Sequence, residues 1–258
     1  MDNVILAWQN FVLVTLRTGF LLFFCPPWDS RLIPLPVRVF SVLGLALALT
    51  PLVAPFLPPF PVSGGALLAL VVREFLLGLA LGLVFRLVFA GVQMAGNLAA
   101  TQMGFGMATL IDPQSQAQST VLAELLLLVT TLLFLTMDGH HALLRLLVRG
   151  FQEVPLSPSL NFPEGLVALI TGLGRLMFQL GVQVLAPVLA LLFLTQLAIG
   201  MVARAVPQIQ VMTVGFPLTI ALGLFFLAAT LVALGPVLVD HLAALKTPLE
   251  QVMGLFRN

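Results

Sequence analysis

Residues 66–89 read ALLALVVREFLLGLALGLVFRLVF, an apolar run in which only Arg73, Glu74 and Arg86 carry a charge. A helix needs roughly 20 predominantly apolar residues to cross a membrane, and this run is long enough. It predicts a membrane-spanning helix, and with it a chain built for a nonaqueous surrounding.

Further stretches of the same character lie at approximately 4–24, 39–57, 120–137, 166–202 and 214–234. The stretch 166–202 is too long for one straight crossing. It contains Pro187, which removes a backbone donor and crowds the preceding turn, so we expect a kink or a break into two elements. The fold class predicted is an all-α membrane protein with about six hydrophobic helical segments, some kinked or broken. No composition shift divides the chain, which favours a single polytopic membrane domain over residues 1–258.

The composition of the whole chain supports the membrane assignment and excludes several functions. Of 258 residues, 60% are apolar and 8% charged, whereas about a quarter of the residues are charged in soluble domains. The net charge of +1 provides no basic field for nucleic acid. The one cysteine, Cys25, excludes an internal disulfide and a multi-cysteine metal site.

The distribution of basic residues does not orient the segments. With six simple crossings, one side carries Arg31, Arg38, Arg86 and Arg204, and the other carries Arg145, Arg149, Lys246 and Arg257. The positive-inside rule cannot decide between equal sides. Either one segment does not cross, or the helices end in an assembly where they contact other proteins more than lipid, which is the interpretation we prefer.

Charged residues within the apolar segments need partners or water, because an ionisable group inside a membrane costs at least a few kcal/mol. The candidates are Arg17, Arg73, Glu74, Arg86, Glu124, Arg175 and Arg204. Arg73 and Glu74 are adjacent and point to different helix faces, so each is expected to find its partner elsewhere. Gly78 and Gly82 form a small-xxx-small pair that allows close approach of another helix.

Two polar stripes are candidates for a pore-facing surface. Helical spacing places three residues on one face in each case: Arg86, Gln93 and Asn97, and Arg175, Gln179 and Gln183. The alternative is that these side chains form hydrogen bonds between helices and only hold the bundle together. Both interpretations remain open from the sequence.

The segment 102–119 is a candidate plug or gate loop. Its first half is soft and apolar with two glycines, and its second half is polar with a helix-breaking Asp-Pro. Irregular backbone at membrane depth is tolerated only where protein or water surrounds it, and methionine-rich surfaces conform to variable partners. We expect a deformable constriction beside a polar passage, with a re-entrant packing loop as the alternative. The candidate gate residues are Gln102, Met103, Gly104, Phe105, Gly106, Met107, Asp112, Pro113, Gln114 and Ser115.

Residues 236–258 form an amphipathic C-terminal tail, with apolar residues at helical spacing and charges between them. Such a helix lies on a surface, either as an interfacial membrane helix or as a docking helix for a partner subunit.

The sequence offers little for catalysis. In Asp138-Gly139-His140-His141 the adjacent histidines are expected to diverge, with no nearby group to complete a third ligand position. Hydrolase, metalloprotease and nucleotide-binding motifs do not occur. We therefore predict no catalytic residue, no metal and no cofactor. A polytopic membrane enzyme using Asp138, His140, His141 or Glu124, and a small-solute secondary transporter, remain as competing functions.

Several short sequence motifs, in matching order and spacing, resemble those of the FliR family of flagellar biosynthesis proteins. They are SRLIPLPVR at 30–38, QMGF at 102–105 running to DPQS at 112–115, DGHH at 138–141, and RAVPQ at 204–208 leading to GFPL at 215–218. The resemblance covers essentially the whole chain. One departure is Asp138, where the family more often has asparagine.

This resemblance implies a structural and gating subunit of the flagellar type III protein export gate, in the bacterial inner membrane at the basal body. The implied partners are FliP-type and FliQ-type subunits, which form a helical cone of helix hairpins with it, then FlhB-type and FlhA-type components, and the unfolded flagellar proteins that are exported. In that family the loop corresponding to 102–119 is a plug of the closed channel. The alternative is the homologous subunit of a virulence injectisome, but Gly139-His140-His141 favours the flagellar branch.

Overall fold

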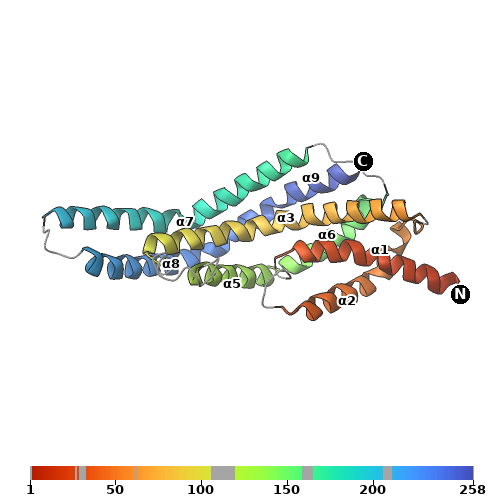
Figure 1. Cartoon of the computed structure of the whole chain (residues 1–258), viewed down its shortest axis with the longest axis horizontal. Coiled ribbons are helices and arrows are strands. Elements are labelled where there is room, and N and C mark those ends of the chain that lie inside the picture. Colours follow the sequence, from red (N-terminus) through yellow and green to blue (C-terminus); the bar gives the residue numbers. More distant parts are fainter. Residues whose placement is uncertain are drawn as a thin grey trace. The chain divides into compact units, whose positions relative to one another are not determined.

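The structure, a computed structural model, describes residues 2–26, 28, 33–61, 63–105, 120–158, 165–205 and 211–257, with backbone only for 2, 3 and 211–214. Within these ranges every regular element is helical (Figure 1), which confirms the all-α class. The helices are α1 (Asp2–Phe24), α2 (Leu35–Val53), the short 3-10 helix η1 (Ala54–Phe56), α3 (Gly64–Met103), α5 (Val121–Thr136), α6 (Gly139–Glu153), α7 (Leu166–Ala205), α8 (Val211–Ala244) and α9 (Lys246–Arg257).

The helices have the lengths of a membrane protein. In the described part of the chain, 5 helices are long and apolar enough to cross a membrane, or up to 6 if α5 and α6, which bend by 65° at a short break, form one span. This agrees with the prediction of about six segments, but the break lies between α5 and α6 and not in the segment 166–202, where it was expected. The chain is therefore a polytopic membrane protein.

Two helices are longer than the apolar runs that predicted them. α3 continues to Met103, although its apolar run ends at Phe89. Residues 90–103 contain polar side chains, which lower hydropathy, but their alanines and glutamines keep a high helix propensity. α7 is one helix of 40 residues with Pro187 inside it, so the proline does not divide it into two elements. A single missing donor is tolerated in an apolar helix whose other amides stay bonded.

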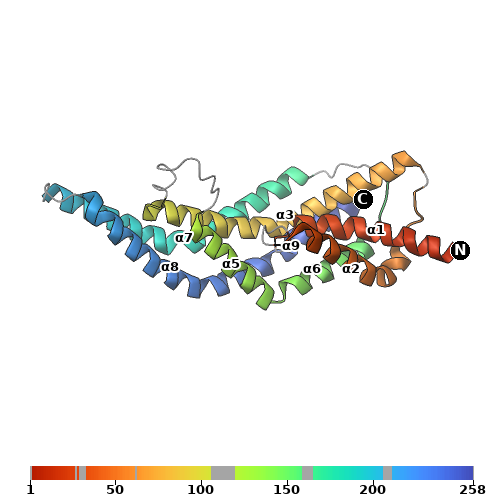
Figure 2. The ribbon, with the colours of Figure 1, turned by 60° about the horizontal axis from the view of Figure 1, so that its bottom comes forward.

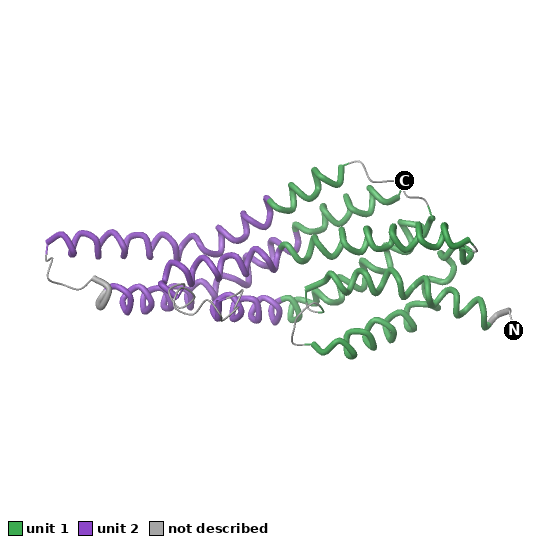
Figure 3. Tube along the Cα trace, viewed as in Figure 1, with its two compact units in different colours: residues 1–87, 134–174, 244–258 green, residues 88–133, 175–243 purple. Residues whose placement is uncertain are grey.

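The chain forms two compact units, shown in Figure 3. Unit 1 comprises Met1–Leu87, Phe134–Gly174 and Ala244–Asn258, and unit 2 comprises Val88–Leu133 and Arg175–Ala243. The long helices α3 and α7 contribute residues to both. The prediction of a single functional membrane domain stays a prediction.

In unit 1, α1 lies directly against α3. A Cβ atom added at Gly78 would lie 2.6 Å from Phe20 Cβ, and one at Gly82 would collide with Phe24. The predicted close approach at this glycine pair is confirmed. Phe75 packs edge-on against the rings of Phe20 and Phe24 on the same face.

In unit 2, small residues bring α3 close to both α5 and α7. A Cβ atom at Gly91 would lie 2.7 Å from the carbonyl oxygen of Met177, and one at Gly96 would lie 2.5 Å from Ala123 Cα. The unit 2 parts of α7 and α8 run beside each other in Figure 1 and in Figure 2. Backbones this close leave no room for side chains larger than hydrogen at either glycine.

The C-terminal tail is divided between two elements. Residues 236–244 are the end of α8, which continues through Pro236, and α9 follows as a separate amphipathic helix. The apolar face of α9 is buried in unit 1 through Pro248, Val252, Met253 and Phe256. These four side chains are covered by the chain itself, and a contact of the rest of the tail with a membrane or a partner subunit stays a prediction.

Candidate functional site

The root of the candidate gate loop is built by the C-terminal cap of α3. Gly104 has φ +94°, a left-handed conformation that favours glycine. Its N–H donates to the carbonyl of Thr101 (3.1 Å), and the Phe105 N–H donates to that of Ala100 (3.0 Å). This pair of bonds closes a helix end with a glycine one residue past it. Sequence chemistry therefore fixes where α3 stops and the loop begins.

Side chains from α8 hold this root in place. Met103 is fully buried, and a Cβ atom at Gly223 would lie 2.6 Å from Met103 Cε. The ring of Phe216 covers Gly104, where a Cβ atom would lie 2.8 Å from Phe216 Cδ1. The Thr219 hydroxyl donates to the Phe216 carbonyl (3.0 Å) and lies 3.4 Å from the Met103 carbonyl, a second and weaker acceptor. The start of the loop is thus fixed on two sides.

The other end of the loop is bound to α3 as well. Asn97 Oδ1 accepts hydrogen bonds from both the backbone N–H and the hydroxyl of Thr120, each at 3.1 Å. Thr120 Oγ1 in turn accepts from the Ala123 N–H (3.3 Å) at the start of α5, as helix-capping threonines do. Asn97 and Gly104 are separated by about 10 Å along the helix axis. The chain therefore leaves and rejoins the same part of α3.

Of the predicted gate residues, the structure brings four to the loop root: Gln102, Met103, Gly104 and Phe105. Gln196 of α7 donates to Gln102 over 3.4 Å. The remaining predicted gate residues lie outside the described residues: Gly106, Met107, Asp112, Pro113, Gln114 and Ser115.

The two polar stripes differ in their surroundings. Asn97 accepts two hydrogen bonds from Thr120. For this residue, the interpretation that the stripe holds the bundle together by hydrogen bonds therefore applies. Gln93 is half-buried and Arg86 is exposed, in different units. The other stripe stays together as an exposed row on α7, formed by Arg175, Gln179 and Gln183. That this row faces a pore remains a prediction.

A buried charge cluster in unit 1 supplies the partners that the sequence required. Arg17 Nε lies 2.6 Å from Glu74 Oε2, and its Nη2 donates to Oε1 at 2.7 Å, a two-pronged pair between α1 and α3. Arg17 Nη1 also donates to the carbonyls of Gly150 (2.6 Å) and Val154 (2.9 Å). Its guanidinium lies 4.7 Å from the ring centre of Phe151, a favourable cation–π distance.

Arg73 is bonded to backbone carbonyls from two other segments. Its Nη1 donates to Pro155 (3.1 Å) and its Nη2 to Phe256 (2.5 Å). The neighbouring charges Arg73 and Glu74 thus find separate partners, which confirms the expectation. Every donor described here is used to join α1, α3, α6 and α9, so the cluster stabilises unit 1 and offers no group for chemistry.

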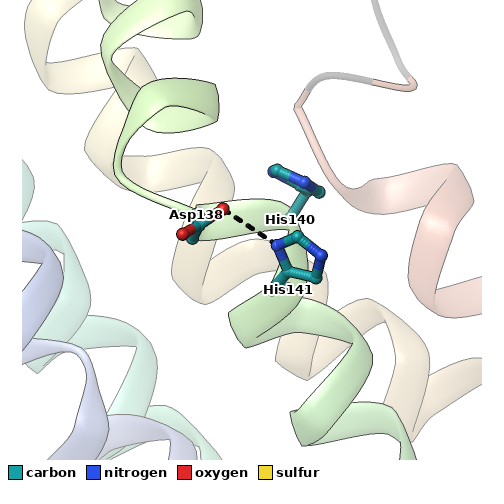
Figure 4. A group of neighbouring side chains, drawn as sticks. All are labelled: Asp138, His140 and His141. Carbon is teal, nitrogen blue, oxygen red and sulfur yellow. Dashed lines mark hydrogen bonds and ion pairs between the residues drawn. The ribbon is translucent and has the colours of Figure 1, made fainter.

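The Asp138-Gly139-His140-His141 segment differs from the sequence expectation (Figure 4). The two imidazole rings lie beside each other, with centroids 4.2 Å apart and planes tilted by 39°, so the prediction that they diverge is wrong. Asp138 has φ 57°, and this left-handed conformation directs its carboxylate over the first turn of α6. Asp138 Oδ1 lies 2.9 Å from His141 Nδ1. The overlooked third group was the aspartate of the motif itself.

Comparison with known proteins identifies the family. Residues 8–245 match the bacterial export proteins, family 1. The flagellar biosynthetic protein FliR of Escherichia coli (strain K12) is 36% identical over 234 residues, which cover 90% of this chain and 88% of that protein. The FliR protein of Bacillus subtilis (strain 168) is 34% identical over 88% of both chains, and that of Aquifex aeolicus (strain VF5) is 28% identical over the full length of both. The chain therefore belongs to the bacterial export proteins of family 1, as a FliR-type subunit of the flagellar type III export gate.

Proposed function

We propose that this chain supplies part of the wall and the gate of the flagellar export channel in the bacterial inner membrane. FliP-type and FliQ-type subunits complete the channel, with FlhB-type and FlhA-type components beside it. Unfolded flagellar proteins pass through the channel by passive conduction, and the energy comes from other parts of the machine. The segment 102–119 acts as the plug of the closed state.

The exposed face of α7 supports assembly with protein subunits. It carries large apolar side chains such as Phe193 and Met201, 61% and 73% exposed, and on the same helix the exposed polar row Arg175, Gln179 and Gln183. Lipid covers apolar side chains but cannot satisfy amides and guanidinium groups. Neighbouring subunits would cover the apolar side chains, and neighbouring subunits or the water of a passage would bond to the polar ones.

The double anchoring of the loop is the observation that carries the gate assignment. Gly104 and Met103 fix one end against α8, and Thr120 fixes the other on Asn97. Both ends of the segment are thus fixed, which suits a plug that stays attached to the channel wall when it is displaced. Its Met, Phe and Gly residues give it a deformable apolar surface, which suits a seal that opens for chains of differing sequence.

Deleting Gly104 to Met107 tests the plug. We expect the gate complex, reconstituted in lipid vesicles, to conduct ions at rest when it contains the deletion variant. Co-purification of the variant with its partner subunits shows that the complex has assembled. An unchanged resting conductance in such an assembled complex would contradict the plug role.

Replacing Phe40 by alanine provides a matched control, because it removes an exposed aromatic side chain from α2, in unit 1, and leaves both the loop and α7 intact. This variant should stay closed at rest. The flagellar branch is tested separately by swimming, which we expect to be lost on deletion of the chain and restored by its return.

A further inference from the structure

We propose that Asp138, His140 and His141 bind a divalent transition-metal ion, with Zn²⁺ as the best-fitting species. One ligand atom from each residue lies within 4.8 Å of the other two. Figure 4 shows the three side chains converging at the break between α5 and α6. All three residues belong to unit 1, and the proposal is independent of the plug function.

The ligand set matches the chemistry of zinc. Two imidazoles and one carboxylate are a common set of three protein ligands, with a fourth position left for water or a further group. Tetrahedral Zn²⁺ with bonds near 2.0–2.1 Å places its ligand atoms about 3.3 Å apart. The ligand atoms present lie within 4.8 Å of one another, so they must approach by up to about 1.5 Å on binding. The side chains of Asp138 and His141 are 69% and 57% exposed, which leaves them room to rotate inward. Mg²⁺ and Ca²⁺ prefer oxygen ligands, so a site with two imidazole ligands does not suit them.

His140 contributes an independent observation. Its Nδ1 atom is buried, and within the described part of the chain it has no hydrogen-bond partner. Burying a polar atom without a partner is unfavourable, so such atoms call for an explanation. An ion bound at Nδ1 would be one, because it would supply the missing partner of this atom.

The backbone beneath the three residues is held in place. Gly139 lies under the ring of Phe134, and a Cβ atom added there would lie 2.6 Å from Phe134 Cζ. Asp138 is the N-terminal residue flanking α6, and its carbonyl accepts the Ala142 N–H at 3.1 Å. His140 and His141 occupy the first turn of that helix. Only side-chain rotation is therefore needed to close the ligand set, and a bound ion would stiffen this turn.

The chain provides a low background for a metal-binding measurement. It contains three histidines and one cysteine, and Cys25 is fully buried. The full chain, carrying an affinity tag without histidine, is purified in mild detergent and stripped with a chelator. Co²⁺ is then titrated as the probe, since tetrahedral Co²⁺ absorbs visible light strongly, and Zn²⁺ is added to displace it.

We expect one equivalent of Co²⁺ with tetrahedral absorption, displaced by one equivalent of Zn²⁺. His141→Ala and Asp138→Asn should each weaken binding by at least about 10-fold, because loss of even an outer-shell contact costs that much at metal sites. His241→Ala is the matched control. The third histidine lies on α8 with its Nδ1 2.9 Å from the Val237 carbonyl oxygen, and this variant should bind as the unchanged chain does.

Circular dichroism of each variant separates lost binding from lost folding, and His141→Gln serves as a second variant if the alanine form does not fold. The proposal is overturned if the unchanged chain retains no Co²⁺ or Zn²⁺ at micromolar concentration. It is equally overturned if the His141 variants bind with unchanged affinity.

Discussion

Replacing the buried Arg17 by methionine should destabilise unit 1 more than replacing any of the exposed arginines of that unit. The change removes the guanidinium that neutralises Glu74, and both side chains are nearly inaccessible, at 2% and 1% exposure. It also removes the donor bonded to the carbonyls of Gly150 and Val154. The carboxylate of Glu74 then stays buried beside α1 without its partner.

The magnitude follows from the geometry. Removing one partner of a buried ion pair costs about 3–5 kcal/mol, because the remaining charge is uncompensated. The Gly150 carbonyl keeps its helical bond from the Val154 N–H, so losing the guanidinium adds little there. Changing both partners to apolar residues, as in Arg17→Met with Glu74→Leu, removes the unpaired charge and should recover most of the loss. Coupling of this sign is what a double-mutant cycle measures.

Exchanging the two charges should fail to restore stability. In Arg17→Glu with Glu74→Arg, a carboxylate at position 17 would face the carbonyl oxygens that Arg17 now donates to. A simple ion pair would tolerate the exchange. A guanidinium that also binds two carbonyls does not, so the exchanged protein should be about as unstable as the single variant.

Thermal unfolding of the full chain in mild detergent provides the assay, and a loss of 3–5 kcal/mol lowers the midpoint by on the order of 10 °C. Arg145→Met is the matched control, since Arg145 is exposed on α6 in the same unit and should change stability by at most about 0.5 kcal/mol. The reasoning is refuted if Arg17→Met and Arg145→Met unfold at the same temperature. It is also refuted if the exchanged protein regains the stability of the unchanged chain.

Three further predictions concern other contacts. Gly78→Ala should lower stability by about 1–3 kcal/mol because its Cβ atom would collide with α1, whereas Gly44→Ala, with nothing within 4 Å, should raise it by about 0.5–1 kcal/mol; thermal unfolding measures both. Asn97→Ala should cost about 1–2 kcal/mol and raise resting conductance by releasing Thr120, while Asn97→Asp keeps the acceptor and should remain closed in the same vesicle assay. Burial raises the pKa of the Cys25 thiol, so a maleimide at neutral pH should label this residue only after denaturation, and rapid labelling of the folded chain would contradict its burial.

The sequence predicted the helices well where apolar length alone decides the outcome. It underestimated α3, because residues 90–103 lose hydropathy without losing helix propensity. It allowed for a break at Pro187, but α7 is continuous through this proline, and the expected kink there stays a prediction. Pro217 and Pro236 likewise lie inside the continuous helix α8. Hydropathy indicates whether a segment can lie in a membrane. It does not measure the backbone hydrogen bonds on which the continuity of a helix depends.

The candidate site was predictable in its position but not in its contacts. The glycine at 104 and the Asp-Pro that follows locate the loop, because both end helices for local reasons. The hydrogen bonds between Asn97 and Thr120 form because the start of α5 packs against α3, and no local sequence pattern predicts that contact. The partners of Arg73 and Glu74 were unpredictable for the same reason. The cost of burying a charge shows that both residues need partners, but only the packing shows that Arg73 donates to backbone carbonyls.

The two units satisfy their polar groups in different ways, and this difference bears on function. In unit 1, the buried charges Arg17, Glu74 and Arg73 are bonded within the chain and need no neighbour to satisfy them. In unit 2, the described part of α7 keeps Arg175, Gln179 and Gln183 exposed beside large exposed apolar side chains. A membrane protein cannot leave such a surface in lipid, because nothing there bonds to amides. Among the described residues nothing covers this surface of α7, so the proposed assembly with other subunits places its contacts in unit 2, the unit that also contains the two ends of the candidate gate loop.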